Sequence, residues 1–167
     1  DLVMSVKPDN ADVVFLGGTN IYRSTSGFTT TAATTRVGGY VSPASYGLYL
    51  NSHPDIHAII FQPGSPGIML CGNDGGIQRT TDNLAGTVVW TQINTGYRTY
   101  QYYYVAMDPN TGNNKVLGGA QDNGSTRNIG GTGTNFELVR GGDGVSVGLS
   151  NVILANTYEY VGTQLGN

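Results

Sequence analysis

Short apolar runs alternate with polar, glycine-rich turns along the whole sequence. Four segments share one order: an apolar run, a turn, a second apolar run that ends in small residues, and an Asn/Asp/Gly turn before a third run. These segments begin at Val3, His57, Tyr104 and Gly144. No window keeps apolar residues at helical spacing for more than a turn or two, and β-forming residues are plentiful. The pattern predicts an all-β protein whose short strands are joined by tight turns.

The segments recur about every 40 to 55 residues, which predicts a repeat architecture. Repeats of this length with several short strands are typical of β-propeller blades, which are four-stranded antiparallel sheets. We therefore expect a β-propeller segment with about four partial blades, whose remaining blades belong to a larger chain. The expected blade units are 1–50, 51–100, 101–141 and a truncated 142–167. In the second unit, Trp90 is expected to start the outermost strand.

The composition agrees with this architecture and excludes several functions. Only 11% of the residues are charged, against about 25% in an average soluble domain, and 26 of the 167 residues are glycine. The net charge is −3 and the 8 basic residues are scattered singly, which argues against nucleic acid as a partner. No apolar run is long enough to span a bilayer. The single cysteine, Cys71, lies in an apolar run and is expected to be a buried, unreactive thiol.

Two stretches carry a resemblance to a known group of proteins. "TTDNLAGTVVW" at 80–90 resembles a stretched Asp-box, the Ser/Thr-x-Asp-x-Gly-x-Thr-x-Trp pattern of BNR repeats. "STSGFTT" at 24–30 resembles a degenerate copy with Ser26 in place of the aspartate. The turns "GNDGGIQRTTD" and "GGAQDNGS" are similar to those of large secreted, sortilin-like propellers of Bacteroidetes-type bacteria, which carry a type IX secretion signal. The resemblance implies a BNR-type propeller that is secreted or displayed on a bacterial cell surface.

The resemblance also implies structural roles for two residues. In an Asp-box the aspartate accepts backbone N–H bonds in a tight turn, and the tryptophan packs between sheets. Asp82 and Trp90 are expected to act in this way. Both residues would therefore stabilise the fold rather than contact a ligand.

Propeller geometry suggests where a functional site would lie. Antiparallel pairing brings the start of the innermost strand and the end of its neighbour to the same face of the disc. The residues expected to gather there, around a central channel, are Asp55, His57, Asn73, Asp74, Gln101, Gln121, Asp122, Asn123 and Asp143. Such side chains bind sugar hydroxyls or peptide groups, and Tyr97, Tyr100 and the tyrosines at 102–104 offer stacking surface beside them. Alternatively, these residues only form tight turns, and most of the tyrosines pack between blades.

The expected function is binding of a glycan or protein partner through this face, without catalysis in this segment. The first alternative is a glycoside hydrolase of the xyloglucanase type, whose blades share this pattern; Asp74, Asp122 and Asp143 are the catalytic candidates. Glycoside hydrolysis needs two carboxyl groups about 5 to 9.5 Å apart. "GNDGGIQR" keeps the aspartate, the glycine pair and Arg79 of that family's Thr-Asp-x-Gly-Gly-x-Tyr-Arg pattern, but Gln78 replaces the aromatic residue. The second alternative is a purely structural module of a large surface protein.

No metal site is predicted, although two stretches are similar to metal-binding patterns. "HPDIH" at 53–57 places His, Asp and His on one side of an extended strand, but no further His or Cys cluster completes a zinc site. A turn in which Asp55 or His57 bonds backbone groups is the alternative. "DPNTGNN" at 108–114 is similar to a calcium loop without the closing glutamate, so calcium stays an alternative to an ordinary turn. Sialidase chemistry is not expected, because it needs three clustered arginines, whereas the candidates Arg23, Arg79, Arg98 and Arg127 lie after turns or in outer strands.

Overall fold

The computed structural model describes residues 2–42, 45–97, 100–109, 112, 114–128, 135–150 and 158–164. The predicted all-β class with four-stranded antiparallel sheets is confirmed; among these residues one 3-10 turn, η1 (Thr31–Ala33), is the only helical element. None of their helical structure is long and apolar enough to cross a membrane. The chain divides into two compact units, which we call the N-terminal unit (Asp1–Tyr97) and the C-terminal unit (Arg98–Asn167).

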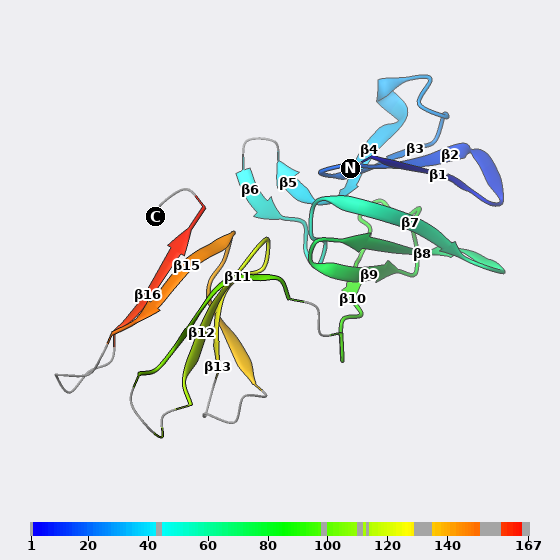
Figure 1. Cartoon of the computed structure of the whole chain (residues 1–167). Helices are drawn as coiled ribbons and strands as arrows, with labels where there is room; N and C mark the ends of the chain where they lie inside the picture. Colours follow the sequence, from blue (N-terminus) through cyan, green and yellow to red (C-terminus); the bar gives the residue numbers. More distant parts are fainter. Residues whose placement is uncertain are drawn as a thin grey trace. The chain divides into compact units, whose positions relative to one another are not determined.

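The N-terminal unit contains two four-stranded antiparallel sheets, in which the strands follow one another in chain order (Figure 1). The first sheet consists of β1 (Val3–Lys7), β2 (Asn10–Gly17), β3 (Ile21–Ser24) and β4 (Thr34–Gly38). The second consists of β7 (Ile56–Gln62), β8 (Ser65–Asn73), β9 (Gly76–Thr80) and β10 (Thr91–Gln92). A hairpin of β5 (Tyr40–Ser42) and β6 (Ser45–Leu48) separates them in the sequence. Strand β7 contacts β1 and β2, so the sheets meet through their first strands.

The C-terminal unit repeats this arrangement. Its four-stranded sheet consists of β11 (Tyr102–Met107), β12 (Val116–Ala120), β13 (Gly124–Asn128) and β14 (Phe136–Arg140). The strands β15 (Gly144–Leu149) and β16 (Glu159–Thr163) form a two-stranded sheet. Strand β15 contacts β11 and β12, as β7 contacts β1 and β2. In both units, therefore, the first strand of a sheet packs against the first two strands of the preceding sheet.

One apolar core joins the two sheets of the N-terminal unit. It consists of Val13, Phe15, Ile21, Val37, Ile56, Ile59, Met69, Cys71, Val88 and Trp90, all buried. The rings of Phe15 in β2 and Phe61 in β7 meet edge to face, with their centroids 5.7 Å apart. Strand alternation explains this core, because Val13 and Phe15 point to the same face of β2. The first and second sheets are thus held together mainly by apolar burial.

The turns predicted from Asn, Asp and Gly are observed between the second and third strands of each four-stranded sheet. Strand β8 turns into β9 at Asp74 and Gly75, and β12 turns into β13 over 121–123. Asp122 adopts φ +58° and Gly76 φ +114°, in the left-handed region where Gly, Asn and Asp are tolerated best. The chain reverses here because residue types that accept this backbone conformation follow an apolar strand.

Asp82 and Trp90 have the structural roles expected of Asp-box residues. The carboxylate of Asp82 accepts the backbone N–H of Leu84 at 3.1 Å. Trp90 is buried, and its Nε1–H donates to the carbonyl of Val37 in the first sheet at 2.7 Å. The outermost strand of the second sheet, β10, begins at Thr91, one residue after Trp90, which was expected to start it.

The bend after the third strand begins with the same kind of hydrogen bond in both sheets of the N-terminal unit. The hydroxyl of Thr80, the last residue of β9, accepts the N–H of Asp82 at 3.3 Å. The hydroxyl of Ser24, the last residue of β3, accepts the N–H of Ser26 at 3.2 Å. Thr80 and Ser24 are both buried. The stretch 24–30 therefore forms a counterpart of the bend that begins at Thr80, with Ser26 in the position of Asp82.

Candidate functional site

The predicted site residues fall into two groups, one in each unit. The N-terminal unit holds Asp55, His57, Asn73 and Asp74, and the C-terminal unit holds Gln101, Gln121, Asp122, Asn123 and Asp143. Within each unit the start of a first strand meets the end of the second strand, because Ile56 pairs with Asn73 and Tyr102 pairs with Ala120. That all nine residues surround one opening stays a prediction.

In the first group, His57 and Asp74 contact each other directly. His57 is the second residue of β7, and its Nε2 hydrogen-bonds Oδ1 of Asp74 in the turn between β8 and β9. The side chains are 42% and 29% exposed, so the pair is open to solvent. The hydrogen bond ties the turn to the start of β7. The imidazole of His57 thus bonds a carboxylate.

Asp55 precedes β7 and occupies a left-handed conformation with φ +60°. Its backbone N–H donates to the carbonyl of Thr19 in the turn between β2 and β3, at 3.1 Å. Burial raises the pKa of the Asp55 carboxyl, and the negative charge of Asp74 raises it further. No group of three His, Cys, Asp or Glu residues in the described ranges is placed to hold a metal ion.

Asn73 belongs to a hydrogen-bonded network that supports the fold. Its Nδ2 donates to Oε1 of Gln78 at 3.0 Å, and Nε2 of Gln78 donates to the hydroxyl of Ser52 at 3.0 Å. Its Oδ1 accepts the N–H of Gly75 at 3.0 Å, which is the Asx turn expected of a turn former. Gln78 is fully buried beside Cys71, and burial raises the pKa of the Cys71 thiol to about 12. The predicted burial of Cys71 is confirmed.

The second group ties the turn between β12 and β13 to its neighbours. The carboxylate of Asp143 accepts the backbone N–H of Asp122 at 3.0 Å. The carbonyl of Gln101 accepts the N–H of Gln121 at 3.2 Å, and the carbonyl of Gln121 accepts from Nδ2 of Asn123 at 3.1 Å. The start of β15 is therefore joined to the turn of the preceding sheet, as Asp55 is joined to Thr19.

The catalytic candidates are divided between the units. Asp74 lies in the N-terminal unit, whereas Asp122 and Asp143 lie in the C-terminal unit, so a catalytic pair with Asp74 stays a prediction. In the stretch that is similar to a calcium loop, Asp108 is buried and its backbone N–H donates to the carbonyl of Lys115 at 3.0 Å. The other calcium candidates, Asn110 and Asn113, lie outside the described residues, as does Arg98.

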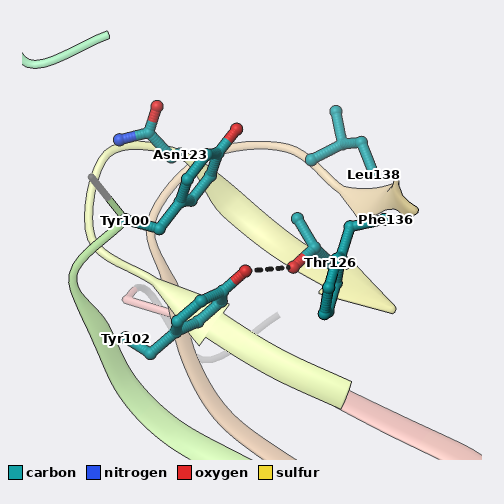
Figure 2. A pocket seen from close by; sticks show the side chains of 6 residues that line it. All are labelled: Tyr100, Tyr102, Asn123, Thr126, Phe136 and Leu138. Atoms are coloured by element: carbon teal, nitrogen blue, oxygen red, sulfur yellow. Dashed lines mark hydrogen bonds between the residues drawn. The ribbon is translucent and has the colours of Figure 1, made fainter. Parts of the chain in front are cut away.

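A cavity of about 400 Å³ opens on the sheet β11–β14 (Figure 2). Its lining consists of Tyr100, Tyr102, Asn123, Thr126, Phe136 and Leu138. The rings of Tyr100 and Tyr102 are stacked, with centroids 5.9 Å apart and planes 19° apart. The hydroxyl groups of Tyr102 and Thr126 are hydrogen-bonded at 2.8 Å, and Figure 2 shows the Asn123 amide beside Tyr100. We call this cavity the tyrosine pocket.

No protein-family model matches the chain, and no curated protein matches it. The resemblance to Asp-box propellers therefore depends on the residues that carry it, above all the bend at Asp82 and the buried Trp90. The tyrosine pocket has to be interpreted from its own chemistry.

The tyrosines of this region are exposed within the described residues, and that most of them pack between blades stays a prediction. Tyr97, Tyr100, Tyr102, Tyr103 and Tyr104 are between 36% and 57% exposed. The last three lie on β11, an edge strand whose pairing with β12 shifts between Tyr102 and Tyr104.

Three lining residues of the pocket were missed in the sequence: Thr126, Phe136 and Leu138. Phe136 and Leu138 alternate in "FELVR", which places them on the same face of β14. Thr126 pairs with Leu138 across the sheet. The alternation of Phe136 and Leu138 indicates that they share a face of β14. That this face lies beside Tyr102 depends on strand register, which the sequence does not show.

Proposed function

We propose that this chain is a BNR-type β-propeller segment of a secreted or cell-surface protein, and that it binds a glycan through the tyrosine pocket. The observation that carries the proposal is the stacked pair Tyr100–Tyr102, which lines the pocket together with Asn123 and Thr126. An aromatic face packs against the C–H groups of a sugar ring, while amide and hydroxyl groups bond its hydroxyls. Ligand sites usually combine a mostly apolar concave surface with a few such polar groups.

The propeller part of the proposal is supported by repetition. Every four-stranded sheet is an antiparallel meander in chain order, which is the topology of a propeller blade. In both units the first strand of one sheet contacts the first two strands of the sheet before it. The bends at Ser24 and Thr80 use the same hydroxyl-to-backbone bond.

The proposal is tested by screening the whole chain against a panel of plant, fungal and bacterial oligosaccharides, followed by calorimetry with Tyr100→Ala. Removing one stacking ring from the pocket should weaken binding about tenfold or more, since burial of an aromatic side chain is worth at least ~1.5 kcal/mol. Tyr103→Ala is the matched control, because Tyr103 is 47% exposed and does not line the pocket.

The results of these binding measurements distinguish glycan binding from glycan hydrolysis. The proposal is supported if Tyr100→Ala weakens glycan binding and Tyr103→Ala leaves it unchanged. No binding by wild type, or equal loss in both variants, contradicts it. If the chain cleaves the bound glycan and Asp74→Asn abolishes this cleavage, the function would be glycoside hydrolysis rather than binding alone.

A purely structural function is the second candidate, and one observation favours it. Thr126, which lines the pocket, precedes Arg127 in β13 as Gln78 precedes Arg79 in β9. Gln78 is buried on the face that packs against the first sheet, so the corresponding face at Thr126 is suited to receive another sheet. In that case the oligosaccharide screen would find no ligand, and Tyr100→Ala would lower stability more than Tyr103→Ala.

A further inference from the structure

The ring of Tyr102 lies directly against the backbone of the neighbouring strand. Tyr102 is the first residue of β11 and pairs with Ala120 of β12. Gly118 lies two residues before Ala120, so both point to the same face of β12. A Cβ at Gly118 would lie 2.5 Å from Cε1 and 2.6 Å from Cδ1 of Tyr102. The ring therefore approaches β12 this closely only because Gly118 has no side chain.

The hydroxyl end of the same ring is held by the next strand. Gly118 pairs with Thr126 of β13, so Thr126 lies beside the backbone that the ring covers. The hydroxyl groups of Tyr102 and Thr126 are hydrogen-bonded at 2.8 Å, as Figure 2 shows. Rotation of the ring away from β12 would leave the buried Thr126 hydroxyl without this partner, which costs free energy. The ring of Tyr102 is thus held at both ends by contacts within the C-terminal unit.

Tyr100 is held in a different way. It precedes β11 and has no partner residue in the sheet. Its ring stacks on the ring of Tyr102, and within the described ranges its side chain forms no hydrogen bond and no ion pair. The direction of the Tyr100 ring is therefore set mainly by the ring of Tyr102.

This arrangement prepares a stacking surface before any ligand arrives. A side chain that is ordered only on binding loses conformational freedom at that moment, and this loss is subtracted from the affinity. Gly118 and Thr126 remove the freedom of the Tyr102 ring in the free protein. A ring stacked on Tyr102 is then already oriented for a ligand.

We propose that Tyr102 is the positioning residue of the tyrosine pocket: Gly118 and Thr126 fix its ring, and that ring orients Tyr100 against the sugar. The inference rests on the proposed function, because it concerns the same pocket. Tyr100 is then the ring that stacks on the sugar, whereas Gly118 determines the affinity from beneath Tyr102 without touching the ligand. The hydroxyl of Thr126 acts through Tyr102 rather than through a bond to the sugar.

The first experiment needs no ligand and uses NMR of the whole chain. Ring currents change the chemical shifts of protons that lie against an aromatic ring, so the Hα protons of Gly118 report on the ring of Tyr102. Their shifts should move strongly in Tyr102→Ala and also in Thr126→Val, which removes the hydroxyl and keeps the shape. Thr126→Ser, which keeps the hydroxyl, should give shifts close to those of wild type.

The second experiment measures binding by calorimetry with hexasaccharides of β-1,4-linked glucose, xylose, mannose and N-acetylglucosamine. For the hexasaccharide that binds most tightly, Tyr102→Phe and Thr126→Val should each weaken binding about three- to tenfold, because the ligand must then order the ring. The double variant should bind no more weakly than either single variant, since both changes remove the same hydrogen bond. Thr126→Ser should bind more tightly than Thr126→Val.

Gly118→Ala tests the contact with the backbone of β12. The added methyl group displaces the ring and should weaken binding about tenfold. In a Tyr102→Ala background, the same change should have no further effect on binding. Gly148→Ala is the matched control, because Gly148 also lies in a strand of the C-terminal unit and its Cβ would come no closer than 3.9 Å to Cβ of Tyr160. The control should bind like wild type, and circular dichroism confirms that the variants fold.

The results distinguish a failure of this inference from a failure of the proposed function. If a hexasaccharide binds but Tyr102→Phe and Thr126→Val weaken binding additively or not at all, the positioning role is wrong. Binding by Gly118→Ala that equals wild type, or Gly118 shifts that Tyr102→Ala leaves unchanged, also contradicts the inference alone. If the Gly118 shifts respond as expected but no hexasaccharide binds, the proposed function is contradicted, and the ring of Tyr102 has a structural role only.

Discussion

At the scale of single residues, Asp55 combines two features that oppose folding. It is an aspartate at φ +60°, and its carboxyl is partly buried near Asp74. Burial first, and then the charge of Asp74, raise its pKa above the ordinary value of 3.8. The folded chain therefore holds this proton more tightly than the unfolded chain. The stability that the protonated carboxyl provides is lost as the pH rises through the folded pKa.

We accordingly expect Asp55→Asn to stabilise the N-terminal unit at pH 7. Asparagine tolerates the left-handed conformation and carries no charge, so the free energy of unfolding should rise by a few tenths of a kcal/mol, a small gain because solvent screens a partly exposed charge. Urea unfolding at pH 7 and at pH 3 measures the effect. The gain should vanish at pH 3, where Asp55 is protonated in both states. A variant that is less stable than wild type at pH 7 would contradict this explanation.

Cys71 provides a second prediction from a shifted pKa. Because burial raises the pKa of the thiol to about 12, the reactive thiolate is scarce in the folded chain. Iodoacetamide at pH 8 should leave the native protein unmodified and alkylate it in urea, as mass spectrometry detects. Cys71 is the single cysteine, so one added group reports on it alone. Rapid alkylation of the native chain would show that β8 is not buried as described.

At the scale of elements, the junction between sheets depends on close approach at one glycine. Gly17 ends β2, and a Cβ at this position would lie 2.7 Å from Cγ2 of Ile56 and 2.8 Å from Cγ1 of Val3. The first strand of the second sheet can approach β2 only because Gly17 has no side chain. The C-terminal unit repeats this contact, since a Cβ on Gly119 in β12 would lie 2.5 Å from the carbonyl oxygen of Val145 in β15.

Gly17→Ala should therefore destabilise the N-terminal unit by about 1–3 kcal/mol through overpacking. Gly67→Ala is the matched control, because Gly67 lies in β8 and its nearest neighbour would be the carbonyl of Thr81 at 3.7 Å. The control should be neutral or slightly stabilising. Chemical unfolding followed by circular dichroism compares the two variants. Equal stability of both would contradict the role given to Gly17.

The sequence predicted the strands and turns better than any other feature. The alternation of apolar residues and the Asn/Asp/Gly turns indicated the meanders, and the Asp-box resemblance indicated the roles of Asp82 and Trp90. The hairpin β5–β6 was missed, because its strands are short and lack a strong apolar alternation. The bond between His57 and Asp74 was not predicted as a pair, since it depends on the register of β7 against the turn after β8.

At the scale of the whole molecule, one arrangement recurs: an antiparallel meander against which the next sheet packs with its own first strand. The repeat predicted the sheets, but local sequence could not show which of their faces are covered. Tyr103 and Phe15 are both aromatic residues within strands, yet the first is 47% exposed and the second is fully buried. The difference arises from whether another sheet packs on that face, which depends on contacts between residues far apart in the chain.

The central claim is that ligand binding occurs at the tyrosine pocket, and an NMR titration of the ¹⁵N-labelled whole chain with its best-binding oligosaccharide tests it most directly. We predict that amide shifts change mainly at Asn123, Thr126, Phe136 and Leu138, and that Tyr100→Ala suppresses these changes. Shift changes centred on His57 and Asp74, or no saturable change anywhere in the chain, would contradict the claim.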